Sequence, residues 1–336
     1  SSSAASDVYK RQVHIQGAGG ADILDSNPDA ISTIAKTIAR CGATSFLATT
    51  VYNANGQNSH LKNAAALTGK NTGGANLLGI HLEGPFISIK KQGMIHSDCI
   101  CPAAESIYDD FMKACGGALR MMTIAPELKN AGGIISRLVK DRVIASFGHS
   151  AANYDETRKG FSSGISHVTH LFNAMMPVHH REPGPVPAIF EEKAITAQVI
   201  TDGVHLHPAI LRLAYRALGP ERFVTITDGM QALGLPDGRY VYKGKDYYAE
   251  NGTARYKDGT LIGTALGLNG LVKRLVKFTG CPLEDAVKTV TEVPAKILGL
   301  EKKKGKLLKG YDADIVVLNK DFSVCKTIVA GRVCGS

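Results

Sequence analysis

Eight apolar, β-like runs recur along the first two thirds of this chain, with segments of helical periodicity between them. Strands that alternate with helices indicate βαβ units, in which the strands run parallel. Eight such units predict an α/β protein whose strands close into a (β/α)8 barrel, a fold that takes about 250 residues. The chain has 336 residues, enough for the barrel and a small second element. The predicted strands span residues 12–16, 44–50, 76–83, 120–125, 142–147, 165–170, 194–201 and 222–227.

For two of the intervening helices, the sequence predicts where the helix begins and ends. Asn27 and Pro28 stand before apolar residues at helical spacing, and Gly42 follows them. This order predicts a helix that is capped by Asn27 and has proline in its first turn. The segment 207–219 has the same pattern, with a proline near its start and Gly219 after its end.

The pattern changes after the eighth predicted strand. Asn251-Gly252 and Asp258-Gly259 are typical hairpin turns, and two helices are predicted beyond them, over residues 265–279 and 283–299. The final residues form short alternating strands without a helix. We therefore expect three parts: an N-terminal segment over residues 1–12, the barrel over residues 13–300 and a small β element over residues 301–336.

The composition indicates an ordinary globular protein, with 44% hydrophobic and 21% charged residues. No apolar run approaches the roughly 18 residues of a membrane span, so we expect no membrane partner. The formal charge of +9 comes from scattered lysines and arginines, which argues against nucleic-acid binding and mildly favours small anionic substrates. Seven cysteines at irregular spacing do not form a disulfide framework, and we expect a reducing, cytoplasmic location.

Polar side chains that can bind metals or transfer protons follow the predicted strands. Because all parallel strands of a barrel end at the same face, we expect these side chains to lie close together there. The sequence therefore predicts a functional site at the C-terminal face of the barrel. The residues concerned are His81, Glu83, His149, His170, Asn173, Asp202, His205 and Asp228.

Three of these residues form a plausible metal-ligand set. Glu83, His149 and His170 supply one carboxylate oxygen and two imidazoles, which suit zinc or a similar divalent ion and leave one position open for water. A lone histidine of this kind is more often a core residue that is hydrogen-bonded to the backbone. Three such residues at strand ends of one face favour the metal.

Asp228 directly follows a β run rich in apolar and β-branched residues, at the expected mouth of the barrel. A carboxylate there can take a proton from a metal-activated water and pass it to a leaving group, and the alternative is a turn aspartate before Gly229. Arg181 and His205 could grip an anion, although an arginine in a Pro/Gly-rich loop is usually only solvated.

The first predicted strand carries His14-x-Gln16, which resembles half of a metal-binding pair. A neutral amide is a weak ligand for a zinc-like ion, so the pair alone does not hold a tight site. We expect a single metal at Glu83, His149 and His170, with His14 and Gln16 hydrogen-bonding near the substrate or lining the barrel floor. A weak second ion at His14 remains the alternative.

Seven segments, in order along the chain, resemble the N-acetylglucosamine-6-phosphate deacetylase family of the amidohydrolase superfamily. They are "GIHLEGPFIS", "SFGHSAANYDE", "THLFNAMMPVHHREPG", "TDGVHLHP", "TITDGMQALG", "GTLIGTALGL" and "GKLLKGYDADIVVLN". The resemblance runs from about residue 13 to the end. It implies a barrel of the amidohydrolase type and hydrolysis of the acetamide of N-acetylglucosamine 6-phosphate, giving glucosamine 6-phosphate and acetate.

The resemblance also implies roles for single residues. Glu83, His149 and His170 fall on the metal ligands, and Asp228 falls on the general acid/base. The cofactor would be one divalent ion per chain, with zinc first and iron, cobalt or manganese as alternatives. The partner would be a phosphorylated amino sugar, and the chain would form a homodimer. Substrate contacts would come from Met94, Asn173, Ala174, Arg181, His205, Ile262, Gly263 and Thr264.

The chain departs from the family pattern at two further places. Where the family has Gly-x-His, this sequence reads Gly93-Met94-Ile95-His96, so the imidazole comes one place late and only the Met94 backbone matches. At the N-terminus, "SSSAASDVYKRQ" resembles none of the β-strands that precede the barrel in the family. We therefore expect the C-terminal element to be half of a β-sandwich, with the N-terminal strands missing and lower stability as the result.

Other functions are compatible with parts of the sequence. The chain could be a deacetylase for N-acetylgalactosamine 6-phosphate, a cyclic amidase, or a truncated and inactive paralogue. Arg181 and the "FNAM" block favour an amino-sugar phosphate, and the intact residues at positions 83, 149, 170 and 228 argue against decay by substitution. A nucleic-acid binder is a poor fit because basic and aromatic residues do not cluster.

Overall fold

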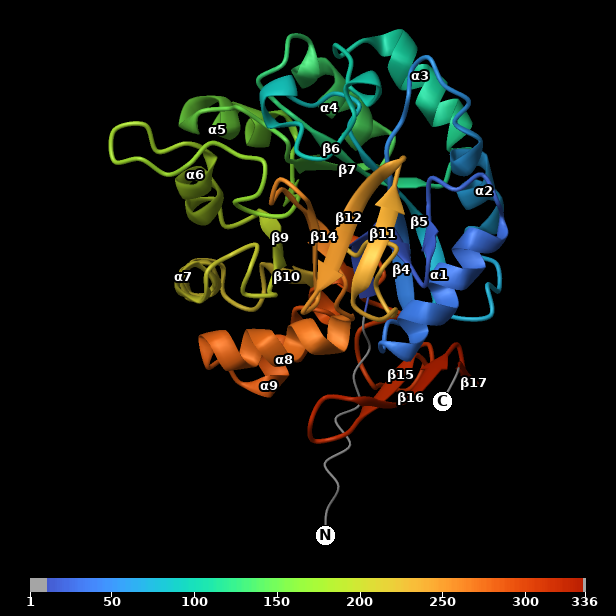
Figure 1. Ribbon diagram of the computed structural model, residues 1–336. Coiled ribbons are helices and arrows are strands. Elements are labelled where there is room, and N and C mark those ends of the chain that lie inside the picture. The colour runs from blue at the N-terminus through green and yellow to red at the C-terminus, as the bar shows by residue number, and fades with distance from the viewer. Residues whose placement is uncertain (1–10, 335–336) are drawn as a thin grey trace.

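A computed structural model describes residues 11–334, and its centre is an eight-stranded parallel sheet in the strand order β1-β4-β5-β6-β7-β8-β9-β10 (Figure 1). All eight predicted strands are confirmed. Most of the predicted segment 1–12 lies outside the described residues, and β1 begins at Arg11. The bounds are β1 Arg11–Ile15, β4 Ser45–Thr50, β5 Asn76–Glu83, β6 Leu119–Ile124, β7 Ile144–Phe147, β8 His167–Val168, β9 Thr196–Ile200 and β10 Phe223–Ile226.

The barrel closes between β1 and the end of β10. The amide of Asp228 donates to the carbonyl of His14 at 3.2 Å, and the amide of Gln16 donates to the carbonyl of Gly229 at 3.0 Å. Below these bonds, the side chain of Gln12 donates to the hydroxyl of Thr227. Closure therefore places the His14-x-Gln16 pair directly beside Asp228.

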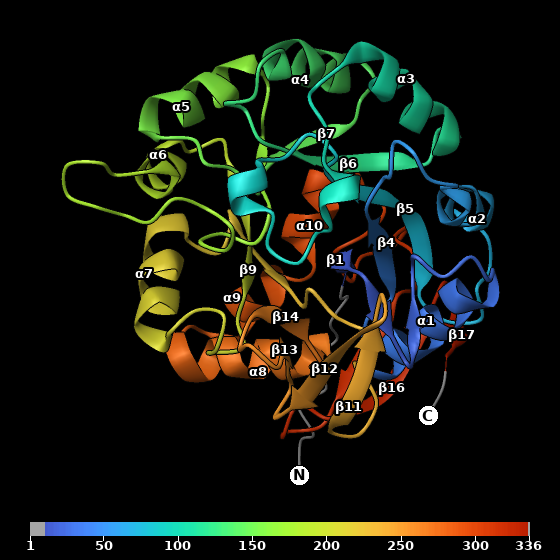
Figure 2. The same cartoon turned by 45° about the horizontal axis from the view of Figure 1, so that its top comes forward.

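Helices surround the barrel as an outer ring (Figure 2). Each turns an apolar side inward, as α1 does with Ile31, Ile34 and Ile38. α1 begins at Asp29, so Pro28 takes the N-cap position that was predicted for Asn27, whose side chain accepts from the Asp29 amide at 3.0 Å. The ring comprises α1 Asp29–Arg40, α2 Ser59–Leu67, α3 Glu105–Ala114, α4 Ala131–Lys140, α5 Tyr154–Ser163, α6 Pro185–Glu191, α7 Pro208–Leu218 and α8 Leu268–Thr279.

The prediction of one helix over residues 283–299 is wrong. The structure has two shorter helices there, α9 (Leu283–Lys288) and α10 (Glu292–Ile297). Pro294 explains the break, because its ring lacks an amide hydrogen and would clash with the carbonyl of Val290 in a continuous helix. Helix α10 lies across the bottom of the barrel, where Val293 joins an apolar cluster with Val13 and Leu47.

The predicted hairpin belongs to a four-stranded antiparallel sheet, β11 (Gly238–Tyr242), β12 (Lys245–Glu250), β13 (Thr253–Tyr256) and β14 (Leu261–Thr264). The Asn251-Gly252 turn joins β12 to β13 with positive φ at both residues, as such turns require. The sheet joins the barrel through β14, because the amide of Thr264 donates to the carbonyl of Asp228 at 2.9 Å. Two short strands, β2 (Gly17–Ala18) and β3 (Ala21–Asp22), form a separate hairpin after β1.

A small antiparallel sheet ends the described chain, with β15 (Ile315–Leu318), β16 (Val324–Val329) and β17 (Arg332–Val333) (Figure 1). The hydroxyl of Thr327 donates to the carbonyl of Ala39 at the end of α1, at 2.7 Å. This sheet confirms the predicted C-terminal β element. The division at residue 300 and the half-sandwich interpretation stay predictions.

Within residues 11–334, no helix is both long enough and apolar enough to cross a bilayer.

Candidate active site

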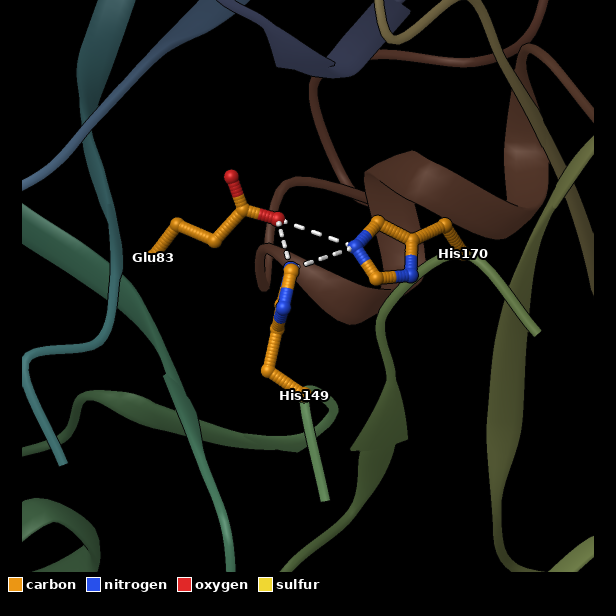
Figure 3. A group of neighbouring side chains, drawn as sticks. All are labelled: Glu83, His149 and His170. Atoms are coloured by element: carbon orange, nitrogen blue, oxygen red, sulfur yellow. Dashed lines mark hydrogen bonds and ion pairs between the residues drawn. The ribbon is translucent and has the colours of Figure 1, made fainter. Parts of the chain in front are cut away.

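Glu83, His149 and His170 meet at the C-terminal face of the barrel, as predicted (Figure 3). Glu83 is the last residue of β5, and the histidines follow β7 and β8. Oε1 of Glu83 lies 3.0 Å from Nε2 of His149 and 2.9 Å from Nε2 of His170, and the two Nε2 atoms are 3.0 Å apart. All three side chains are buried. We call this cluster the metal triad.

The hydrogen bonds around the triad fit a bound cation. The carbonyl of Lys91 is 2.7 Å from Nδ1 of His149 and can only accept, so Nδ1 carries the hydrogen. Nε2 is then the nitrogen that faces Glu83, and in a neutral ring its lone pair would be free to bind a cation held between the two side chains. A backbone carbonyl behind a histidine ligand is usual in metal sites. Three ligands of these types also leave a position open, as in catalytic zinc sites.

Both histidines of the triad and Asp228 have strained backbone conformations. φ is +48° at His149, +28° at His170 and +47° at Asp228. Residues other than glycine rarely adopt positive φ, and such strain is concentrated at functional sites. Each of the three is the second residue after a barrel strand, namely β7, β8 and β10. The strained backbone at these positions turns their side chains toward the barrel mouth.

Asp228 lies beside the metal triad and is held from β1. Nε2 of Gln16 donates to Oδ1 of Asp228 at 3.3 Å and to Oε2 of Glu83 at 3.5 Å. Nε2 of His14 lies 3.2 Å from the same Oδ1 atom and 3.7 Å from Oε1 of Glu83. The His14 contact is an ion-pair approach rather than an aligned hydrogen bond, since this nitrogen has no hydrogen-bond partner in the described chain.

The electrostatics keep both carboxylates ionised. Burial alone would raise the pKa of Glu83, but the charge of His14 and the hydrogen bonds from His149 and His170 outweigh burial and hold this pKa well below its usual range. For Asp228, burial is again outweighed by His14, and the pKa is lowered. Burial would lower the pKa of His14, yet the carboxylates of Asp228 and Glu83 raise it to about 9. Asp228 is therefore ready to accept a proton.

A pocket opens above the triad, and most of the predicted substrate contacts line it. The side chain of His205 is 4% exposed and hydrogen-bonds through Nδ1 to the buried carboxylate of Asp202. The β14 segment forms one wall. The lining residues are Gln16, Glu83, Gly93, Met94, His149, His170, Asn173, Ala174, His205, Asp228, Leu261, Ile262 and Gly263.

Two predicted contact residues do not line this pocket. Arg181 lies in the segment before α6, which projects outward from the ring of helices (Figure 2), and it is exposed and donates to His180 at 2.7 Å. Thr264 is buried behind the wall, where its hydroxyl donates to the carbonyl of Thr227 at 2.8 Å. His96 is the imidazole that comes one place late in the family pattern. It is exposed, forms an ion pair with Asp98 and does not line the pocket.

Some supporting residues were not predicted. Gln198 on β9 is fully buried, and its Oε1 lies 2.9 Å from Nδ1 of His14. The only signal was one amide within the apolar run "AITAQVIT". His81 was among the candidates, but it binds the carbonyl of Val13 and the hydroxyl of Thr123 below the triad. Burial lowers its pKa, so His81 is a neutral core histidine.

Comparisons with known proteins agree with this geometry. The sequence model of the Amidohydrolase family matches residues 12–334. N-acetylglucosamine-6-phosphate deacetylase of Bacillus subtilis is 37% identical over 325 residues, which cover 96% of this chain and 82% of the relative. N-acetylgalactosamine-6-phosphate deacetylase of Escherichia coli O157:H7 is 34% identical over 322 residues, 95% of this chain and 85% of that protein.

The solved structures give the same result. A point mutant of N-acetyl-D-glucosamine-6-phosphate deacetylase from Mycobacterium smegmatis, in complex with N-acetyl-D-glucosamine 6-phosphate, superposes with a TM-score of 0.91 at 32% identity. The superposition covers 98% of this chain and 87% of the chain of the mutant enzyme. The fold, the metal triad and these matches together show that the chain is an amidohydrolase and a member of the N-acetylglucosamine-6-phosphate deacetylase family.

Proposed function

We propose that this protein hydrolyses the acetamide of N-acetyl-D-glucosamine 6-phosphate, giving D-glucosamine 6-phosphate and acetate. The observation that carries the proposal is the metal triad with the ionised Asp228 beside it, at the floor of a pocket lined by most of the expected substrate contacts. The names of the relatives at 32% identity and above support the substrate class.

The residues of the triad would hold one divalent ion. When bound, the ion would polarise the acetamide carbonyl and make a nearby water easier to deprotonate. Zinc suits one carboxylate and two imidazoles, and iron, cobalt and manganese are the alternatives. Metal analysis of the purified protein, by mass spectrometry of the eluted ions, decides the identity; two tightly bound ions per chain would contradict the single site.

Asp228 would perform the proton transfers. Its lowered pKa keeps it ionised near neutral pH, so it can take the proton of the attacking water. The same carboxyl would then give that proton to the departing amine. Gln16 and His14 hold Oδ1 of Asp228 in place. Because the carboxylate is already positioned, less entropy is lost when it is aligned with the substrate.

The pocket walls would orient the sugar and exclude water. Met94, Asn173 and Ala174 form one side, and Ile262 and Gly263 of β14 form the other. Thr264 would act from behind, by holding the backbone carbonyl of Asp228 through its own amide. Arg181 lies outside the pocket of its own chain, so its phosphate contact stays a prediction.

A second candidate substrate is N-acetylgalactosamine 6-phosphate. It is favoured by the Escherichia coli relative, whose 34% identity is close to the 37% of the Bacillus subtilis enzyme. Acetate release from the two sugar phosphates and from unphosphorylated N-acetylglucosamine, measured side by side, separates the two readings. Release from neither sugar phosphate by metal-loaded protein would support the inactive paralogue instead.

We also propose a cytoplasmic homodimer, as the resemblance implies. An apolar hollow beside α6 and α7 supports this assembly, with Val178 55% and Leu213 50% exposed at its edge. A second copy could cover these side chains. Sedimentation equilibrium should give twice the chain mass, and a chain that stays monomeric at micromolar concentration would contradict the dimer.

A further inference from the structure

Asp202 and His205 form a buried pair in the loop between β9 and α7. Oδ2 of Asp202 lies 2.7 Å from Nδ1 of His205, and the side chains are 0% and 4% exposed. His205 lines the pocket, whereas Asp202 lies behind it. Burial would raise the pKa of Asp202, but the hydrogen bond and charge of His205 outweigh burial, and the pKa is lowered. The pair is therefore a carboxylate with a bound imidazole.

Asp202 also fixes the backbone that carries His205. Its Oδ1 accepts from the amides of Val204 and His205, each at 2.8 Å. Its own carbonyl accepts from the guanidinium of Arg274 on α8 at 2.6 Å. One residue thus sets both the turn and the side-chain direction of His205, which leaves the imidazole little freedom.

The hydrogen bond determines which ring nitrogen is available to a ligand. A carboxylate can only accept, so Nδ1 of His205 must donate to it. Nε2 is then left for the pocket that His205 lines. If Nε2 also donates to an anion, the ring is positively charged, and the carboxylate of Asp202 balances that charge.

The chemistry of the lining residues identifies what Nε2 would bind. Among the described residues that line the pocket there is no lysine or arginine, and His205 is the one basic side chain outside the metal triad. We propose that Asp202 is a positioning residue for phosphate recognition: it holds His205 with Nε2 directed at the phosphate of the substrate. This inference rests on the proposed function.

The test compares Asp202→Asn with a matched control, Asp141→Asn. The first variant keeps one oxygen for the turn but places an amide group where Nδ1 needs an acceptor. Asp141 accepts from the hydroxyl of Tyr108 at 2.7 Å and is not among the residues that line the pocket, and its replacement changes the net charge equally. Both variants are loaded with metal. Calorimetry then measures binding of D-glucosamine 6-phosphate and D-glucosamine, and kinetics measure KM and kcat.

For Asp202→Asn we expect about a tenfold weaker affinity for D-glucosamine 6-phosphate and a matching rise in KM, because a charge-assisted hydrogen bond is lost. Binding of D-glucosamine and kcat should change less than about threefold. In a His205→Ala background, Asp202→Asn should have no further effect on phosphate affinity. The control should match the parent chain throughout.

A readout without turnover completes the test. Spectra of protein with ¹⁵N-labelled histidine should show His205 as the Nδ1–H form in the parent and in Asp141→Asn, and not in Asp202→Asn. Unchanged phosphate affinity in Asp202→Asn, or an equal loss for both sugars, would refute the role of Asp202. If the metal-loaded parent chain bound neither N-acetyl-D-glucosamine 6-phosphate nor the product D-glucosamine 6-phosphate, the proposed function itself would be refuted.

Discussion

Nε2 of His14 approaches Oδ1 of Asp228 to 3.2 Å inside the barrel, where both side chains are buried. In the metal-free protein this ion pair couples stability to pH. The pKa of His14 is raised from 6.5 to about 9 in the folded state. Its contribution to stability is therefore fully present below about pH 6.5 and is lost as the pH rises through 9.

His14→Asn tests this coupling. Thermal melts of the metal-free parent should show a falling midpoint between pH 7 and pH 9.5, and the variant should lose most of that slope. Burial raises the pKa of the Cys99 and Cys101 thiols to about 11, above this pH range, and any thiol contribution is common to both proteins. Parallel slopes for parent and variant would show that His14 is not cationic in the fold.

Metal binding should stabilise the protein through the metal triad. At a free ion concentration about a hundred times Kd, the linkage amounts to about 2.7 kcal/mol. We expect the melting midpoint of the metal-free parent to rise by several degrees on addition of zinc, and that of Glu83→Gln to rise much less, because the carboxylate oxygen is the shared contact of both histidines. Equal increases would place the ion elsewhere.

Gly263 tests the link between β14 and Asp228. A Cβ at this position would lie 2.4 Å from the carbonyl oxygen of Asp228 and 2.8 Å from Cγ of Met230. We expect Gly263→Ala to shift the Asp228 backbone, lower kcat at least tenfold and destabilise the fold by about 1–3 kcal/mol. Gly259→Ala is the matched control, since Gly259 also has positive φ but has no atom within 4 Å of the added Cβ. Equal effects would assign the loss to backbone strain alone.

Arg181→Ala should chiefly raise KM for the phosphorylated sugar, if the arginine contacts the phosphate. His180→Ala is a suitable control, because His180 is the neighbour to which Arg181 donates. An unchanged KM in Arg181→Ala would agree with its exposed position outside the pocket and would end the phosphate assignment.

The barrel and the metal triad were predictable from the sequence for a physical reason. Buried parallel strands read as apolar runs, and the barrel geometry carries the residue after each run to one face, so Glu83, His149 and His170 had to lie close together. The resemblance to a family then gave the chemistry of the site.

Contacts that depend on three-dimensional detail were not predictable. The carbonyl of Lys91, which orients His149, has no side-chain signature, and Gln198 is a single amide in an apolar strand. The break before α10 was missed because apolar periodicity continues through Pro294. The location of Arg181 could not be predicted from the sequence either, since a Pro/Gly-rich loop has no repeating pattern that fixes the path of its backbone.

The most direct test of the account is acetate release from N-acetylglucosamine 6-phosphate by the metal-loaded parent and by Asp228→Asn, with metal content measured on the same samples. We predict one tightly bound ion in both proteins, turnover by the parent, and at least a hundredfold lower kcat in the variant, because a general acid/base contributes about 10²–10⁴-fold. Full activity of Asp228→Asn with its metal in place would contradict the central claim.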